Sequence, residues 1–265
     1  MGVFAGGNIF MLVNRRCDED GGRFIDVKVD ISPVNDAIVC QYEFFGAEVI
    51  SEGVGDRKFT VYLGPGEGCL YSFHQQRIES FIDSNMCIRG DFFIEDSVEV
   101  TADAMLTILP GSRIIFVDDG SLHVRGQLKA LGKYDAAGDS SVSFISLTNP
   151  NNGLVSLYST QTDTFSYCKF SHLETGLKVS KSSSSKVEID HCEFSYNEDE
   201  GLYVSGGEVT VTSSEFRENG GDGLYLYDCK ATLDSLTVAR NVENGAYCYS
   251  ISSSSAITNS SFMNN

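Results

Sequence analysis

The feature that most constrains this chain is a repeat of 22 to 24 residues between residues 163 and 265. Five apolar residues mark its successive units at intervals of 24, 22, 22 and 24 residues: Phe170, Phe194, Phe216, Val238 and Phe262. Four of them are followed three residues later by an asparagine: Asn197, Asn219, Asn241 and Asn265. A period in the low twenties predicts a solenoid, in which each unit contacts only its neighbours.

The segments between these residues predict strands. Every apolar run is three to five residues long and alternates with polar residues, as in Val187-x-Ile189 and Val209-x-Val211, whereas a helix needs a longer stripe of period 3.6. Thr, Val, Ser, Tyr and Phe fill the runs, and Asn, Gly and Asp fill the gaps. Each unit is therefore one coil of about three short strands, which buries its apolar side only by stacking.

This repeat resembles the right-handed parallel β-helix repeat, the coil shared by pectate-lyase-like enzymes and many surface proteins. Upstream, Pro110-Gly111 followed by Leu122-x-Val124-x-Gly126-x-Leu128 is similar to the entry coils of bacterial β-helix proteins. The resemblance implies an all-β fold with a β-helix over residues 96–265, and it indicates architecture better than activity. The last coil stops at Asn265 without a cap, so we expect a β-helix truncated at its C-terminal end, in a piece of a longer protein.

The N-terminal part predicts smaller β modules. Alternation from Phe24 to Ile31 indicates a strand, and the following Pro-Val-Asn-Asp-Ala is similar to the end of bacterial cadherin-like repeats. Residues 1–36 are thus expected to end a β-sandwich module, and residues 37–95 to form a small β module or spacer. The resemblance implies a larger extracellular protein, with Asn35 and Asp36 as calcium ligands; an ordinary Asn-Asp turn is the alternative.

Charge and cysteine content exclude some classes of function. A net charge of −18 leaves no basic patch for nucleic acid, and no apolar stretch approaches the roughly 18 residues of a membrane span. The eight cysteines contain no C-x-x-C pair, so no zinc site and no required cofactor are predicted. The repeat places Cys168, Cys192 and Cys248 in inward positions as buried thiols. The disulfide state of the others in the N-terminal part stays open: Cys17, Cys40, Cys69 and Cys87.

A file of aromatic residues is the main candidate binding site. On the strand after each repeat glycine, alternation points one leucine inward and its successors outward. The outward positions of neighbouring coils hold Lys178, Tyr203, Tyr225, Tyr227, Tyr247 and Tyr249. Flat rings with a hydroxyl group suit saccharide rings, so these residues are the predicted ligand-binding residues. The alternative is simple strand propensity, because tyrosine is favoured on exposed strands.

Two further motifs carry titratable groups. Glu200 and Asp222 occupy one position in adjacent coils, where a carboxylate pair could bind Ca²⁺ or act as acid and base; solvated turn residues are the alternative. The run Val187–Ser195 is similar to the Trp-Ile-Asp-His motif of pectate lyases, with Glu188 in place of tryptophan. The arginine-bearing motif of those enzymes is missing from the sequence, so Asp190 and His191 are interpreted as ordinary coil residues.

These observations predict a non-catalytic, adhesin-like segment of a large secreted or cell-surface protein that binds polysaccharide or another surface. Two alternatives remain: a polysaccharide lyase or glycoside hydrolase whose site contains Glu200 and Asp222, and a structural stalk without a ligand. An enzyme requires a cleft with shifted pKa values, a binding module requires an exposed tyrosine stripe, and a stalk would cover those tyrosines with loops.

Overall fold

The computed structural model describes strand backbones within residues 2–74, and then residues 78, 80–135, 138–147 and 153–265, apart from the side chains of residues 135 and 138–139. The chain divides into two compact units, Met1–Arg77 and Ile78–Asn265. In the first unit, one antiparallel sheet contains, in spatial order, β1 (Gly2–Val3), β2 (Ile9–Val13), β7 (Gly68–His74), β4 (Ile38–Glu43) and β5 (Gly46–Ser51). A second pair consists of β3 (Arg23–Val29) and β6 (Arg57–Leu63).

Strands from the two sides of the predicted division at residue 36 pair with each other. Strand β2 pairs with β7, and β3 pairs with β6, so strands from both sides of residue 36 belong to the same sheets. A boundary there would cut these ladders, whose hydrogen bonds hold the strands together. The strand predicted from the alternation between Phe24 and Ile31 is present as β3.

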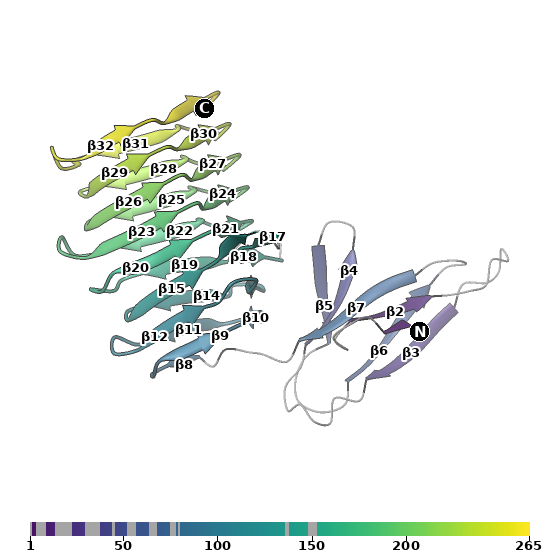
Figure 1. Cartoon of the computed structure of the whole chain (residues 1–265). Coiled ribbons are helices and arrows are strands. Elements are labelled where there is room, and N and C mark those ends of the chain that lie inside the picture. Colours follow the sequence, from purple (N-terminus) through teal and green to yellow (C-terminus); the bar gives the residue numbers. More distant parts are fainter. Residues whose placement is uncertain are drawn as a thin grey trace. The chain divides into compact units, whose positions relative to one another are not determined.

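The second unit is a parallel solenoid of three eight-stranded sheets, in which each coil contributes one strand to each sheet (Figure 1). The first sheet contains β8 (Phe81–Ile82), β11 (Ser97–Val100), β14 (Ser121–Val124), β19 (Leu154–Leu157), β22 (Leu177–Ser180), β25 (Leu202–Ser205), β28 (Leu224–Tyr227) and β31 (Ala246–Tyr249). The second contains β9 (Met86–Ile88), β12 (Met105–Ile108), β15 (Gln127–Leu131), β20 (Asp163–Ser166), β23 (Lys186–Asp190), β26 (Glu208–Thr212), β29 (Lys230–Asp234) and β32 (Ala256–Thr258). The third contains β10 (Asp91–Ile94), β13 (Arg113–Phe116), β18 (Val142–Ser146), β21 (Cys168–Ser171), β24 (Glu193–Ser195), β27 (Glu215–Arg217), β30 (Thr237–Ala239) and β33 (Ser261–Met263).

The solenoid begins one coil earlier than the predicted boundary at residue 96. Strands β8, β9 and β10 pair in parallel with β11, β12 and β13, so Phe81 to Ile94 already form a complete coil. This coil lacks the Phe–Asn–Gly spacing of the later repeats, which explains why the sequence pattern missed it. A short antiparallel hairpin, β16 (Lys133–Asp135) with β17 (Gly138–Ser140), leaves the third coil between its second-sheet and third-sheet strands.

A column of phenylalanines fills the core behind the third sheet. The register aligns Phe144, Phe170, Phe194, Phe216, Val238 and Phe262 in successive coils. The first four rings are fully buried and stack with centroids 4.6 to 4.7 Å apart. The coil spacing of a parallel sheet, about 4.8 Å, matches that of the rings, so one repeated phenylalanine makes a continuous stack.

The recurring asparagines form a hydrogen-bonded ladder at the corner between the third and first sheets. The Nδ2 of Asn197 donates to Oδ1 of Asn219 at 2.9 Å, and Asn219 repeats this contact with Asn241 at 2.8 Å. Each Oδ1 also accepts the backbone N–H of the preceding asparagine, at 3.2 Å. Asn197 and Asn219 are buried, so the ladder provides hydrogen bonds to polar groups that have no access to water.

The repeat glycine has a steric reason to be at this corner. A Cβ on Gly201 would lie 2.7 Å from the carbonyl oxygen of Gly223 and 3.0 Å from the amide nitrogen of Asn219. Gly176 and Gly223 are equally crowded. The coils approach too closely here for a side chain, which is why the asparagine and the glycine recur together.

Candidate functional site

The register confirms that the tyrosines line up on one face. Tyr203 pairs with Tyr225, and Tyr225 with Tyr247, while the leucines beside them are fully buried. Tyr227 pairs with Tyr249 two positions further along the strands, and Lys178 precedes Tyr203 in the previous coil. Tyr227, Tyr247 and Tyr249 are 39 to 58% exposed, and Tyr203 and Tyr225 are half-buried. We call these five residues the tyrosine file.

The rings of the tyrosine file lie on edge. Tyr203 and Tyr225 stack with centroids 5.0 Å apart at 9°, and Tyr225 stacks on Tyr247 at 5.0 Å. The ammonium of Lys178 lies 5.8 Å from the centroid of Tyr203. The ring faces therefore contact one another, and the edges and hydroxyl groups, which are furthest from the backbone, point outward. The expectation that flat faces would meet a saccharide ring is not met along the file.

The carboxylates Glu200 and Asp222 lie at the start of the same strands, in one position of adjacent coils. Glu200 accepts a hydrogen bond from the Thr175 hydroxyl at 3.3 Å, and Asp222 accepts two from Asn244, both at 2.8 Å. Asp222 is 3% exposed, so it is a buried ladder residue and not a solvated turn residue. Thr175, Glu200, Asp222 and Asn244 each precede a repeat glycine, so this ladder follows the corner.

The pKa values of Glu200 and of the neighbouring Tyr225 are both raised. Partial burial raises the pKa of Glu200, and the nearby carboxylates of Asp199 and Asp222 add to the shift. Loss of solvation also raises the pKa of Tyr225, with further contributions from Tyr247, Tyr203 and the two carboxylates. These influences show that the tyrosine file and the carboxylates share one electrostatic environment.

The predicted calcium ligands Asn35 and Asp36 lie outside the described residues, so their role stays a prediction. Among the residues that the structure describes, no group of three or more His, Cys, Asp or Glu side chains could hold a metal ion. Nor does the described part contain a helix long and apolar enough to cross a membrane.

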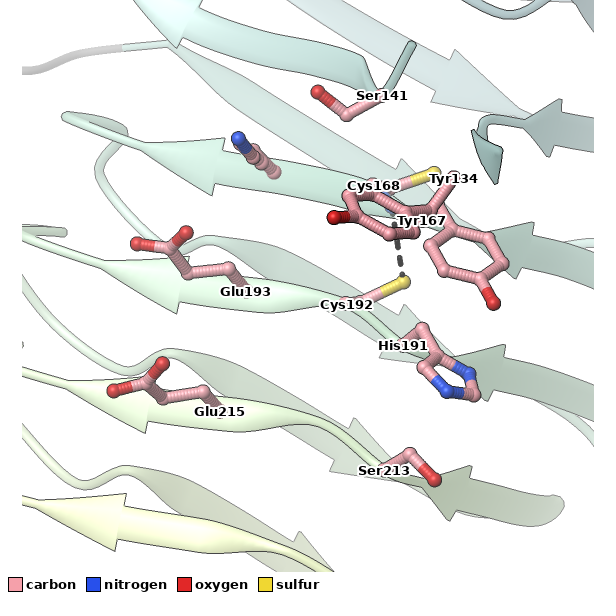
Figure 2. A pocket seen from close by; sticks show the side chains of 10 residues that line it. Tyr134, Ser141, Tyr167, Cys168, His191, Cys192, Glu193, Ser213 and Glu215 are labelled. Atoms are coloured by element: carbon pink, nitrogen blue, oxygen red, sulfur yellow. Dashed lines mark hydrogen bonds between the residues drawn. The ribbon is translucent and has the colours of Figure 1, made fainter. Parts of the chain in front are cut away.

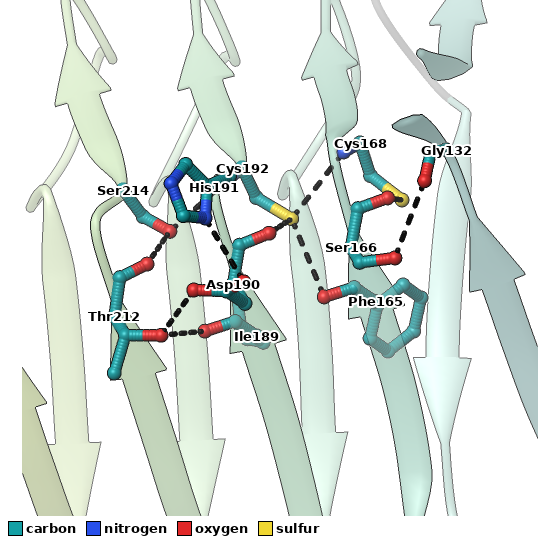
Figure 3. A network of polar contacts seen from close by, with 10 residues as sticks. All are labelled: Gly132, Phe165, Ser166, Cys168, Ile189, Asp190, His191, Cys192, Thr212 and Ser214. Atoms are coloured by element: carbon teal, nitrogen blue, oxygen red, sulfur yellow. Dashed lines mark hydrogen bonds and ion pairs between the residues drawn. The ribbon is translucent and has the colours of Figure 1, made fainter. Parts of the chain in front are cut away.

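The predicted cysteine positions are correct for two residues and wrong for one. Cys168 and Cys192 are buried free thiols whose sulfur atoms donate to backbone carbonyls, and the N–H of Cys168 contacts the Cys192 sulfur at 3.4 Å (Figure 3). Burial, with Cys192 nearby, raises the pKa of Cys168 well above its usual value. Cys248 aligns with the buried Leu226, but it is exposed because β31 is the last strand of the first sheet.

A hollow of about 270 Å³, which the sequence did not indicate, lies at the corner between the second and third sheets (Figure 2). Tyr167, His191 and Ser213 line it from the same corner position of three coils, each with a left-handed φ near 50°. Tyr134 of the hairpin and Glu215 of the third sheet complete two of its sides. In the sequence, the only sign of this hollow was that Tyr167 and His191 each lie three residues before a repeat phenylalanine, which places them at the same position of adjacent coils.

The motif that resembled a pectate-lyase sequence lies at this hollow. His191 stacks on Tyr167 with centroids 4.7 Å apart, and its Nδ1 lies 2.9 Å from Oδ2 of Asp190. The Thr212 hydroxyl donates to the other oxygen of Asp190 (Figure 3). Asp190 therefore contacts both His191 and Thr212, and the interpretation of Asp190 and His191 as ordinary coil residues stays a prediction.

Comparison with known proteins agrees with this architecture. Residues 137–265, just under half of the chain, match the family model for the right-handed β-helix region. The solenoid is thus a right-handed parallel β-helix, a fold found in pectate-lyase-like enzymes and in proteins without enzymatic activity. Neither a curated protein nor a solved structure matches the chain.

Proposed function

We propose that this chain is a non-catalytic binding segment of a secreted or cell-surface protein, and that it holds an extended polysaccharide along the first sheet. The observation that supports the proposal is the tyrosine file, whose outward hydroxyl groups recur with every coil. The rings of Tyr203, Tyr225 and Tyr247 are 5.0 Å apart. A polymer lying along the solenoid axis would meet a phenol at each coil and exchange hydrogen bonds with it.

The chemistry of this surface favours a neutral or weakly basic hydroxyl-rich ligand. The hydroxyl of Tyr225 can both donate and accept, and the nearby Glu200 and Asp222 only accept when ionised. Lys178 provides one cation at the beginning of the file. The exposure of Tyr227, Tyr247 and Tyr249 supports a binding surface over a stalk, in which loops would cover them.

A second candidate is a polysaccharide lyase or hydrolase that uses Glu200 as an acid. The raised pKa of Glu200 beside Asp222 favours it, because a general acid must stay protonated near the working pH. The two hydrogen bonds that Asn244 donates to Asp222 count against it, since they give that carboxylate a structural partner. Calcium bound by Asn35 and Asp36 and membership of a larger protein remain parts of the proposal that rest on the sequence.

The test is a glycan-array and polysaccharide pull-down screen that compares the wild type with a Tyr203→Ala/Tyr225→Ala/Tyr247→Ala variant. Loss of three hydrogen-bonding side chains predicts weaker binding by about 10- to 100-fold. A Thr210→Ala/Thr232→Ala variant, altered on the outward face of the second sheet, serves as the matched control and should bind normally.

The same samples are assayed for reducing ends and unsaturated products. Binding that is lost in the tyrosine variant without product formation supports the proposal. Product release that survives the tyrosine substitutions but stops with Glu200→Gln or Asp222→Asn would contradict the proposal and support the polysaccharide lyase or hydrolase. If the wild type shows neither binding nor turnover in the screen, the structural stalk would be the remaining interpretation.

A further inference from the structure

Cys168 and Cys192 occupy the same position in two adjacent coils. Each lies two residues before a repeat phenylalanine, and the register pairs the residues that follow them, Lys169 with Glu193. Of the five cysteines that the structure describes, these two alone share a repeat position. Neighbouring parallel strands are about 4.8 Å apart, and the Cα atoms of disulfide-bonded cysteines are usually about 4.4 to 6.8 Å apart. The coil spacing therefore brings the two backbones within disulfide range.

The two side chains are also turned toward each other's coil. The backbone N–H of Cys168 donates to the Cys192 sulfur at 3.4 Å, so this sulfur points at the preceding coil (Figure 3). Burial raises the pKa of Cys168 well above its usual value, and a hydrogen bond with the Cys192 side chain adds to the shift. The residues before them, Tyr167 and His191, have matching left-handed φ values of 49° and 52°. Equal local backbones direct both thiols to the same side of the corner.

The other hydrogen bonds of these thiols are weak. The Cys168 sulfur donates to the carbonyl groups of Ser166 and Ala130 at 3.3 and 3.4 Å, and Cys192 makes similar contacts at 3.3 and 3.7 Å. A thiol is a poor donor, so the loss of these contacts on oxidation costs little. The carbonyl of Ser166 also accepts the backbone N–H of Gly132 at 2.8 Å, so it keeps a partner.

The hollow gives a small oxidant access to the pair. Both cysteines belong to its lining, together with Tyr134 and Ser141 (Figure 2). Its volume of about 270 Å³ is many times the roughly 30 Å³ that one water molecule occupies in the liquid. Because both thiols are 3% exposed or less, we expect them to react more slowly than the exposed Cys87.

We propose that Cys168 and Cys192 form a disulfide bond that links two adjacent coils when the chain meets a low-molecular-weight disulfide. The N–H of Cys168 favours negative charge on the Cys192 sulfur, which attacks the small disulfide and releases one small thiol. Cys168 then loses its proton, attacks the Cys192 sulfur and releases the second small thiol. The protein thiols lose two electrons and two protons, and the small disulfide gains both to become two thiols.

The bond would close one complete coil, residues 168–192. A disulfide restricts the unfolded chain, so the oxidised form should be the more stable one. The link lies at the corner between the second and third sheets, away from the tyrosine file on the first sheet. An extracellular location, which belongs to the proposed function, would supply the oxidant, but the pairing itself does not depend on that function.

The experiment treats the folded full chain with an excess of cystamine and then blocks the remaining thiols with N-ethylmaleimide in denaturant. Tryptic peptides are analysed by mass spectrometry with and without reduction. In most molecules, the peptide that contains Cys168 should be linked to the peptide that contains Cys192, and the link should disappear on reduction. The oxidised chain should also melt at least about 5 °C above the reduced chain.

Two variants serve as controls. Cys192→Ser suits the site, because Ser214 occupies this position in the next coil and accepts the N–H of Cys192 at 3.0 Å. It should abolish the difference in melting temperature between the oxidised and reduced forms and leave polysaccharide binding unchanged. Cys229→Ser/Cys248→Ser removes two other cysteines and should keep both the link and the difference.

Three results would overturn the proposal. The first is N-ethylmaleimide on both Cys168 and Cys192 after oxidation of the wild type. The second is a link from either residue to another cysteine. The third is an equal difference in melting temperature between the oxidised and reduced forms of Cys192→Ser and of the wild type.

Discussion

Two aromatic columns run along this solenoid, one inside and one outside, and they differ in what surrounds them. The first four rings of the phenylalanine column behind the third sheet are fully buried and lie 4.6 to 4.7 Å apart. The tyrosine file on the first sheet has nearly the same spacing, 5.0 Å, but lies at the surface. The same repeat thus produces both columns. Because the inner column is buried, it contributes to stability, whereas the outer column lies at the surface and is available for binding.

The largest expected effect separates the two columns directly. Phe194→Ala would open a cavity between two stacked rings and should lower the free energy of unfolding by about 3 to 5 kcal/mol. Tyr225→Ala removes a ring from the surface and should cost less than about 1.5 kcal/mol. Urea unfolding of both variants measures the difference, and comparable losses for the two would contradict the division of roles.

A buried ion pair gives the second largest effect. Lys181 and Asp163 have fully buried side chains with a 2.8 Å contact, and Lys181 also donates to Ser159 and to the carbonyl of Gln161. Lys181→Met would leave Asp163 charged and unpaired, at a cost of about 3 kcal/mol. Adding Asp163→Asn to that variant removes the unpaired charge, so thermal unfolding should show partial recovery. A double variant less stable than Lys181→Met would argue that the pair does not act through charge.

The asparagine ladder should contribute less per residue than a core ring. Asn219→Ala removes the Oδ1 that accepts from the backbone and side chain of Asn197, leaving two buried donors unsatisfied. The expected loss of unfolding free energy is about 2 to 3 kcal/mol. Asn265→Ala, at the last coil and exposed, is the matched control and should cost clearly less. Equal losses at the two positions would show that burial does not govern the ladder.

How much of this could be predicted from the sequence depends on whether a feature repeats. The registers of Phe194, Asn219 and Tyr225 follow from a fixed period, because stacked coils bring identical positions together. The on-edge tyrosine rings could not be predicted, because ring orientation depends on side-chain torsions and on contact with the next coil. The Lys181–Asp163 pair joins residues at non-equivalent positions, so the period gave no indication of it. The hollow depends on the inserted hairpin that carries Tyr134, which has no counterpart in the other coils as far as the structure describes them.

The smallest expected effect concerns the pH dependence of stability at the edge of the tyrosine file. Because burial in the folded state raises the pKa of Glu200 above its usual value of 4.5, folding favours its protonated form. The contribution of this group is therefore fully present below about pH 4.5 and is lost as the pH rises through the raised pKa. Glu200→Gln should therefore lose less stability than the wild type as the pH rises from about 4.5 through the raised pKa of Glu200, as measured by thermal melts. Parallel pH profiles for the two proteins would show that Glu200 is not perturbed.

The most direct test of the central claim replaces the outer hydroxyl groups and keeps the outer rings. In a Tyr203→Phe/Tyr225→Phe/Tyr247→Phe variant, the stack retains its size and shape, so the melting temperature should stay within a few degrees of the wild type. If the file binds through its outward hydroxyl groups, the affinity for the retained polysaccharide should fall by about tenfold or more. Full affinity in the phenylalanine variant, together with an unchanged melting temperature, would contradict the account.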